Sequence, residues 1–167
     1  MFNRCKIYWR RLNDKAEVPT KRAEDAGFDI YTIEQDITVS AHCQHLFSTG
    51  LAAAVSKGWW LKVEDRGSTG SKGLHCHCGI VDNGYRGEIF ICIKNDNAYD
   101  VVFTDKEEPG FKSAEGKKYL VYPTAKAIAQ LIPMKQPKVT SKEVDAKKWA
   151  ELSNTQRGGG KLGSSGK

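Results

Sequence analysis

The chain has 167 residues, of which 40% are hydrophobic and 28% are charged, with a formal net charge of +6. This size and composition are ordinary for a globular domain with a proper hydrophobic core. No apolar run approaches the roughly 20 residues that a membrane-spanning helix needs, and the N-terminal stretch MFNRCKIYWRR lacks the apolar core of a signal peptide. We therefore expect a cytoplasmic protein without a membrane partner.

The predicted elements are short strands separated by turns that are rich in Gly, Pro, Asn and Asp. Strands of this length, spaced by about 8 to 12 residues and rich in β-branched and aromatic side chains, are typical of an all-β sandwich or barrel. The sequence predicts them at residues 6–12, 28–33, 36–40, 45–55, 59–65, 74–81, 88–95, 99–104, 117–122 and 128–134.

Three other segments complete the chain. Residues 104–118 are charged and contain glycine, so we expect an exposed loop. Residues 141–152 predict one short helix, with Ser141 as its N-cap. The glycine-rich stretch after it predicts a flexible C-terminal arm. The expected organisation is thus a β domain over residues 1–153 and an arm over residues 154–167.

The five cysteines and the basic charge narrow the function classes. An odd number of cysteines without framework spacing predicts reduced thiols. The charge suits nucleic acid, but it also suits a small polyanion such as a nucleotide phosphate chain. The lysines are spread out and do not alternate with aromatic side chains along a stripe. This distribution argues against a dedicated nucleic-acid module.

The stretch GIVDNGYRGEI, residues 79–89, places a carboxylate directly before a turn. Asn83-Gly84 is a strong signal for a type I′ hairpin turn. Asp82 therefore has two interpretations: it starts the turn, or it holds a water molecule for chemistry. The neighbouring Tyr85, Arg86 and Glu88 favour the second interpretation.

The stretch EDRGSTGSKGL, residues 64–74, combines glycines and hydroxyls with Arg66 and Lys72. Backbone N–H groups, hydroxyls and cations in this arrangement can bind an anion, although a solvated turn has the same composition. It does not have the Walker A order. The C-terminal RGGGKLGSSG, residues 157–166, repeats the pattern, and its alternative is a disordered tail or a cloning remnant.

The HCHC stretch, residues 75–78, contains ligand types that zinc prefers. In a strand, however, His75 and His77 point to one face while Cys76 and Cys78 point to the other. We therefore expect thiols that face the core rather than a metal site. A hydrolase with a nucleophilic serine is not indicated, because the G-x-S-x-G elbow is absent.

Taken together, the motifs resemble those of the trimeric deoxyuridine triphosphatase (dUTPase) family. Five short motifs define that family, and the chain has a counterpart of each in the same order over nearly its whole length. The third, GIVDNGYRGEI, is nearly identical to the family pattern. The five counterparts are DAGFDIY (25–31), EDRGSTGSKG (64–73), GIVDNGYRGEI (79–89), AIAQLI (127–132) and RGGGKLGSSG (157–166).

The resemblance implies a fold and an activity. It implies a jelly-roll-like subunit, a distorted β-barrel or sandwich, in a homotrimer with three sites at subunit boundaries. The enzyme would hydrolyse dUTP to dUMP and pyrophosphate, limiting uracil in DNA and supplying dUMP for dTTP synthesis. Mg²⁺ would bridge the triphosphate oxygens without direct protein ligands.

The resemblance also implies roles for individual residues. Asp82 would activate the water that attacks the α-phosphorus. Asp29 would act through the water shell of Mg²⁺ or by organising Arg66. The phosphate-binding residues would be Arg66, Ser68, Gln130, Arg157, Ser164 and Ser165. The residues around the uracil and deoxyribose would be Cys76, Gly79, Val81, Asp82, Tyr85 and Leu162.

Four departures from the family pattern concern the ligand. Gly67 stands where a serine usually follows the arginine, and Lys126-Ala127 replaces the usual Asp-Arg. Lys161-Leu162 replaces a glycine and the phenylalanine that stacks on uracil, and the segment before Asp82 is one residue shorter. They leave two alternatives open: a pyrophosphatase for another or modified deoxynucleotide, or a non-catalytic nucleotide-binding protein. A viral or phage origin, with the host cytoplasm as location, would suit such divergence.

Overall fold

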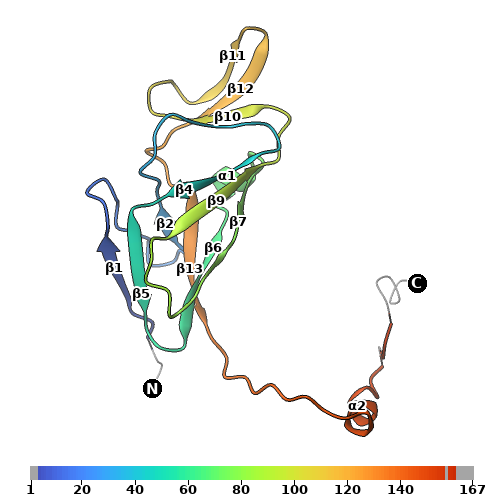
Figure 1. The fold of residues 1–167 in the computed structure, drawn as a ribbon. Coiled ribbons are helices and arrows are strands. Elements are labelled where there is room, and N and C mark those ends of the chain that lie inside the picture. Colours follow the sequence, from blue (N-terminus) through green and yellow to red (C-terminus); the bar gives the residue numbers. More distant parts are fainter. Residues whose placement is uncertain (1–3, 157, 161–167) are drawn as a thin grey trace. The chain divides into compact units, whose positions relative to one another are not determined.

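The computed structural model describes residues 4–156 and 158–160. The chain divides into two compact units, Met1–Gln136 and Pro137–Lys167. The first unit consists of strands with one helical turn, α1 (Gly67–Gly70) (Figure 1). Its strands are β1 (Ile7–Arg11), β2 (Phe28–Ile30), β3 (Ile37–Val39), β4 (Gln44–Ser48), β5 (Leu51–Val55), β6 (Trp59–Glu64), β7 (Leu74–His77), β8 (Ile80–Val81), β9 (Phe90–Asn95), β10 (Asp100–Phe103), β11 (Gly110–Ala114), β12 (Lys117–Tyr122) and β13 (Ala129–Lys135).

The strands form four small sheets in which strands distant in sequence lie side by side (Figure 1). One sheet has the order β2-β13-β6-β8 and another the order β4-β9-β7. The sheet β11-β12-β10-β3 contains the parallel pair β10 and β12, and β1 pairs with β5. Because β13 pairs with both β2 and β6, it brings three motif-bearing parts of the chain to one sheet.

Alternating side chains build the core. Leu61 and Val63 on β6 are buried, while their neighbours along the strand are partly exposed, as expected for a strand with one face inward. Side chains of the β2-β13-β6-β8 sheet, such as Leu61, meet those of the β4-β9-β7 sheet, such as Phe47 and Ile91, in one buried cluster. Phe47 and Phe103 are fully buried, with ring centroids 4.6 Å apart.

This architecture confirms the predicted all-β class, and several finer predictions need correction. The described strands do not close into a barrel. The predicted loop at 104–118 is partly wrong, because residues 110–114 form β11 and pair with β12. The glycines and charged residues of 104–118 gave no strand pattern, because the side chains of β11 are largely exposed.

The predicted hairpin at Asn83-Gly84 is also wrong. A type I′ turn needs a positive φ at both residues, and neither has one. A turn does form, since the Tyr85 N–H donates to the Asp82 carbonyl at 3.1 Å. It does not join paired strands, because β8 pairs with β6 while β9 pairs with β4 and β7.

The predicted strand at 74–81 is interrupted. Cys78 has a φ of 56°, which ends β7 and lets the chain cross to β6, where β8 forms. Cys76 is partly buried and packs against the core, but Cys78 is exposed. The expectation that both thiols face the core is therefore wrong for Cys78, because the strand alternation stops at His77.

The second unit contains α2 (Ala146–Leu152). The predicted helix started too early: Asp145 rather than Ser141 is the N-cap, and its carboxylate accepts a hydrogen bond from the Lys148 N–H at 2.7 Å. With α1, the described residues contain two short helices where one was expected. Neither of these helices is long and apolar enough to cross a membrane.

Candidate functional site

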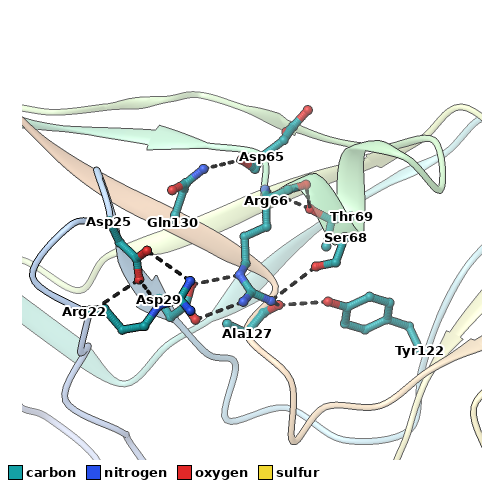
Figure 2. Close-up of polar contacts among 10 residues, drawn as sticks. All are labelled: Arg22, Asp25, Asp29, Asp65, Arg66, Ser68, Thr69, Tyr122, Ala127 and Gln130. Atoms are coloured by element: carbon teal, nitrogen blue, oxygen red, sulfur yellow. Dashed lines mark hydrogen bonds and ion pairs between the residues drawn. The ribbon is translucent and has the colours of Figure 1, made fainter.

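An arginine–aspartate pair joins the first two motifs (Figure 2). Arg66 directly precedes α1, and Asp29 lies on β2. The Nε and Nη2 atoms of Arg66 donate to the two carboxylate oxygens of Asp29 at 2.8 and 2.9 Å. Such a two-point contact fixes the orientation of the guanidinium plane.

The remaining nitrogen of the Arg66 fork reaches two other parts of the site. Nη1 donates to Ser68 Oγ and to the Ala127 carbonyl, each at 3.2 Å. The Tyr122 hydroxyl also donates to the Ala127 carbonyl, at 2.8 Å. Arg66 thus ties the first, second and fourth motifs together (Figure 2).

Gln130 lies on β13, opposite Asp29 on one side and Glu64 on the other. Its side-chain amide donates to the Asp65 carbonyl at 2.7 Å. A Cβ at Gly27 would lie only 2.5 Å from Gln130 Oε1, so the glycine of the first motif makes room for this side chain. The predicted residues Asp29, Arg66, Ser68 and Gln130 therefore meet.

These residues line a cavity of about 670 Å³. Its wall also contains residues 20–22 and 25–27, which lead into and begin the first motif and include the cations Lys21 and Arg22. Gly67, which departs from the family pattern, leaves no side chain here, and Ser68 brings a hydroxyl to the cavity. Cations, hydroxyls and amides of this kind can bind a phosphate chain.

Asp65 was not among the predicted site residues, yet it connects the second motif to β7. Its carboxylate accepts from the Cys76 N–H at 2.5 Å and contacts His75 Nδ1 at 2.7 Å. Burial acts to raise the pKa of Asp65, but the hydrogen bonds from Cys76 and His75 outweigh it and hold that pKa below its ordinary value. The position directly before Arg66 is the only sequence signal that pointed to this role.

The segment predicted to contact the base runs along β6. Gly79 lies so close to β6 that a Cβ at this position would be 2.9 Å from the backbone carbonyl oxygen of Val63 on that strand. Val81 pairs with Leu61. Burial raises the pKa of the Cys76 thiol, which therefore stays protonated near neutral pH. Gly79 and Val81 thus form an edge along β6, whereas Cys76 lies on β7 and pairs with Ile93 of β9.

Asp82 and Tyr85 lie at the other end of this edge, in a turn fixed by Asn83. The Asn83 side-chain amide approaches three backbone carbonyls, those of Val55, Ser56 and Trp59, at 3.3, 2.9 and 2.7 Å. Asp82 is exposed and lines a second cavity, of about 300 Å³, with Trp60. Among the described residues, no side chain or backbone group hydrogen-bonds to its carboxylate.

Tyr85 is 45% exposed, and its hydroxyl donates to the Glu88 carbonyl at 2.8 Å. The Glu88 carboxylate accepts from the Gly50 N–H at 2.8 Å and from the Ser48 hydroxyl. The turn is therefore bonded to the β4–β5 connection, while its carboxylate and phenol ring remain accessible. An exposed carboxylate can hold a water molecule, and an exposed aromatic ring can pack against a sugar.

The two groups of site residues lie apart within one chain. Val81 pairs with Leu61, so Asp82 lies beside Trp60, at the start of β6, whereas Arg66 follows its end. Six residues of extended chain span roughly 20 Å. One chain therefore does not bring Asp82 to Arg66. Arg157, Leu162, Ser164 and Ser165 lie outside the described residues.

Comparison with known proteins decides the family. A family model described as dUTPase matches residues 14–107, more than half of the chain. The chain belongs to the dUTPase family. A deoxyuridine 5′-triphosphate nucleotidohydrolase of Candida albicans is 34% identical over 97% of this chain and 87% of its own length. The enzyme of the same name from Corynebacterium jeikeium is also 34% identical, over 93% of this chain and 90% of its own length.

Solved dUTPase structures share the fold. The dUTPase of Staphylococcus bacteriophage 80alpha with dUPNHPP superposes with a TM-score of 0.70 at 23% identity, covering 97% of this chain and 99% of that one. A mutant dUTPase from phage phi11 of S. aureus, described with a structural Mg(II) ion, superposes with a TM-score of 0.66 at 20% identity. The match covers 84% of this chain and 97% of that one. These dUTPases share the overall fold of this chain.

Proposed function

We propose that this protein hydrolyses dUTP to dUMP and pyrophosphate. One observation carries the proposal: Asp29, Arg66, Ser68 and Gln130, from three separate motifs, line one cavity whose groups suit a phosphate chain. The dUTPase family and the names of its curated relatives supply the substrate. The exposed carboxylate of Asp82 supplies the remaining chemical function, a general base for water.

The proposed chemistry is an in-line attack of water on the α-phosphorus. Asp82 accepts a proton from the water as the bond to phosphorus forms, and pyrophosphate leaves with the electrons of the broken P–O bond. Arg66 and the hydroxyl of Ser68 stabilise the charge of the phosphates. The ring of Tyr85 lies against the deoxyribose, where a 2′-hydroxyl would clash.

The residues of the cavity fit a magnesium ion held by the nucleotide. Each oxygen of Asp29 accepts one hydrogen bond from Arg66 and keeps a lone pair that could accept from a water molecule of the ion. No group of three or more candidate ligands occurs within residues 4–156 and 158–160. Mg²⁺ on the triphosphate would neutralise charge as pyrophosphate leaves, while Asp29 keeps Arg66 in place beside it.

The separation of Asp82 from Arg66 supports a site shared between chains. The phosphates held near Arg66 and the α-phosphorus attacked beside Asp82 belong to one short chain of linked phosphates. Roughly 20 Å of strand is too long for that chain to bridge. A second copy of the chain, in a homotrimer, would bring its Asp82 edge to the cavity of the first. The arm over residues 154–167 would close the same site and exclude water.

The test is pyrophosphate release from dUTP, dCTP, dTTP, dATP and dGTP with Mg²⁺. We expect turnover of dUTP and little of the others, because a site that pairs with the uracil edge leaves polar groups unpaired when cytosine binds. Turnover of a different nucleotide would point to the altered base pocket, and binding without any turnover would point to a regulatory protein. Either result would contradict the proposal.

A further inference from the structure

The cavity contains an arginine that the family motifs do not assign. Arg22 lies in the segment before the first motif and lines the same 670 Å³ cavity as Arg66, Ser68 and Gln130. Its partner is Asp25, which accepts from Nε at 3.0 Å and from Nη2 at 3.1 Å. Figure 2 draws this pair beside the pair of Asp29 and Arg66.

A count of donors separates the two arginines. A guanidinium has five N–H groups. Arg66 uses four of them within the protein: two for Asp29, one for Ser68 and one for the Ala127 carbonyl. In the part of the chain that the structure describes, Arg22 uses two side-chain N–H groups, both for Asp25. Arg22 thus keeps three donors for a ligand, and Arg66 keeps one.

The solvent exposure of the two arginine side chains also favours Arg22 as the one free to bind a ligand. The Arg22 side chain is 88% exposed, against 27% for Arg66. An exposed ion pair contributes little to stability, so the cost of turning part of the Arg22 fork toward an anion is small. The buried side of Arg66, by contrast, is committed to holding three motifs together.

The segment that carries Arg22 is nevertheless held by hydrogen bonds of its neighbours. Lys21 Nζ donates to the carbonyls of Arg22, Ala23 and Asp25 at 3.0, 3.3 and 2.8 Å. The Thr20 carbonyl accepts from the Asp29 N–H at 2.9 Å, which anchors the segment to β2. Lys21 therefore spends its ammonium donors on the backbone and leaves Arg22 as the cation that faces the cavity with donors to spare.

The fourth motif gives a reason for a cation here. Ala127 stands where that motif usually has arginine, so no guanidinium extends from position 127 beside Arg66, although Lys126 replaces the usual aspartate. We infer that Arg22 binds the terminal phosphates of the nucleotide, supplying the charge and donors that position 127 does not. This inference rests on the proposed function, because it takes the cavity as the triphosphate site. Arg66 then acts mainly by holding Asp29, Ser68 and Ala127 in place around the cavity and by attracting the phosphates with its charge.

The test measures binding of inorganic tripolyphosphate and of dUMP by calorimetry, with the full chain at fixed salt. Arg22→Gln should weaken tripolyphosphate binding about tenfold or more, since hydrogen bonds to charged groups are lost. Binding of dUMP should change less than twofold, because dUMP lacks the terminal phosphates. The matched control is Arg11→Gln, an exposed arginine of β1 that does not line the cavity, and it should change neither.

Three results would overturn the inference: tripolyphosphate binding by Arg22→Gln equal to that of the wild type, an equal loss for dUMP, or absence of tripolyphosphate binding by the wild type. Failure of the proposed function looks different. In that case the wild type releases no pyrophosphate from dUTP, while Arg22→Gln still loses tripolyphosphate binding selectively.

Discussion

The cavity around Arg66 and the turn around Asp82 are built in opposite ways. In the cavity, most polar groups already bond to one another: Arg66 to Asp29, Ser68 and Ala127, and Gln130 to Asp65. In the turn, the backbone is fixed by Asn83, but the Asp82 carboxylate and the Tyr85 ring stay exposed.

The difference fits the two chemical tasks that we propose for these regions. A phosphate site acts by charges and dipoles held in place before the ligand arrives, so its groups need support from the protein. A general base must reach a water molecule and exchange a proton with it, so its oxygens cannot be occupied. The turn therefore supplies an open carboxylate on a rigid backbone, and the cavity supplies a rigid electrostatic frame.

The largest expected effect comes from Asp82→Asn. The amide keeps the size of the side chain but is not a base, so kcat should fall by on the order of 10² to 10⁴. Binding of a non-hydrolysable dUTP analogue should persist, because the cavity is unchanged. Turnover in Asp82→Asn at the wild-type rate would show that the turn has no part in the chemistry.

Removal of residues 156–167 should come second. The arm carries Arg157, and the loss of its hydrogen bonds to phosphate should lower kcat/KM by about tenfold or more. Light scattering should report the same assembly as the intact chain, since the core lies in residues up to 136. Full activity in the truncated protein would show that both regions of the site work without a closing arm.

A third effect distinguishes the backbone of the turn from the side chain of Asp82, the proposed general base. Asn83→Ala removes the amide that holds the turn to Ser56 and Trp59, and should cost about 1–3 kcal/mol of unfolding free energy together with activity. Asn97→Ala is the control, because Asn97 also bonds a backbone carbonyl, that of Lys72, but outside the turn. Urea unfolding and dUTP turnover should separate the two: only Asn83→Ala should lose activity beyond its loss of stability.

The smallest effect concerns the pH dependence of stability that Asp65, next to the cavity residue Arg66, contributes. The pKa of folded Asp65 lies below its ordinary value because hydrogen bonds from Cys76 and His75 outweigh burial. The stabilisation is thus fully present above the unfolded-state pKa of about 3.9 and is lost as pH falls through the folded-state pKa. Asp65→Asn should make urea unfolding less dependent on pH in that acidic range. An unchanged pH dependence would contradict the role of Asp65, and Asp14→Asn in an exposed loop serves as control.

The strand pattern predicted most of the fold because short β-branched and aromatic runs report directly on a buried face. It missed β11, whose side chains are mostly exposed and carry no such pattern. It misjudged the turn at Asn83-Gly84 because local turn propensity says nothing of which strands pair. The chain instead crosses to β6 at Cys78, which depends on tertiary packing rather than on the local sequence.

The site was predictable in its motifs but not in its geometry. The grouping of Asp29, Arg66, Ser68 and Gln130 follows from β13 pairing with both β2 and β6, which no single segment encodes. For the same reason, the distance between Asp82 and Arg66 and the place of Arg22 in the cavity became visible only in the fold. The roles of all the site residues, at the phosphates, at the base, at Asp82 and in the arm, stay predictions.

Mixing two inactive variants tests most directly whether Asp82 and Arg66 act together in a site shared between chains. Asp82→Asn and Arg66→Gln would be co-refolded, so that mixed assemblies contain some sites with both native residues. We predict that the mixture recovers dUTP turnover well above either variant alone. The control, Asp82→Asn with Tyr85→Ala, damages the same turn twice and should not recover. A mixture of Asp82→Asn and Arg66→Gln that stays at the level of the single variants would contradict the account.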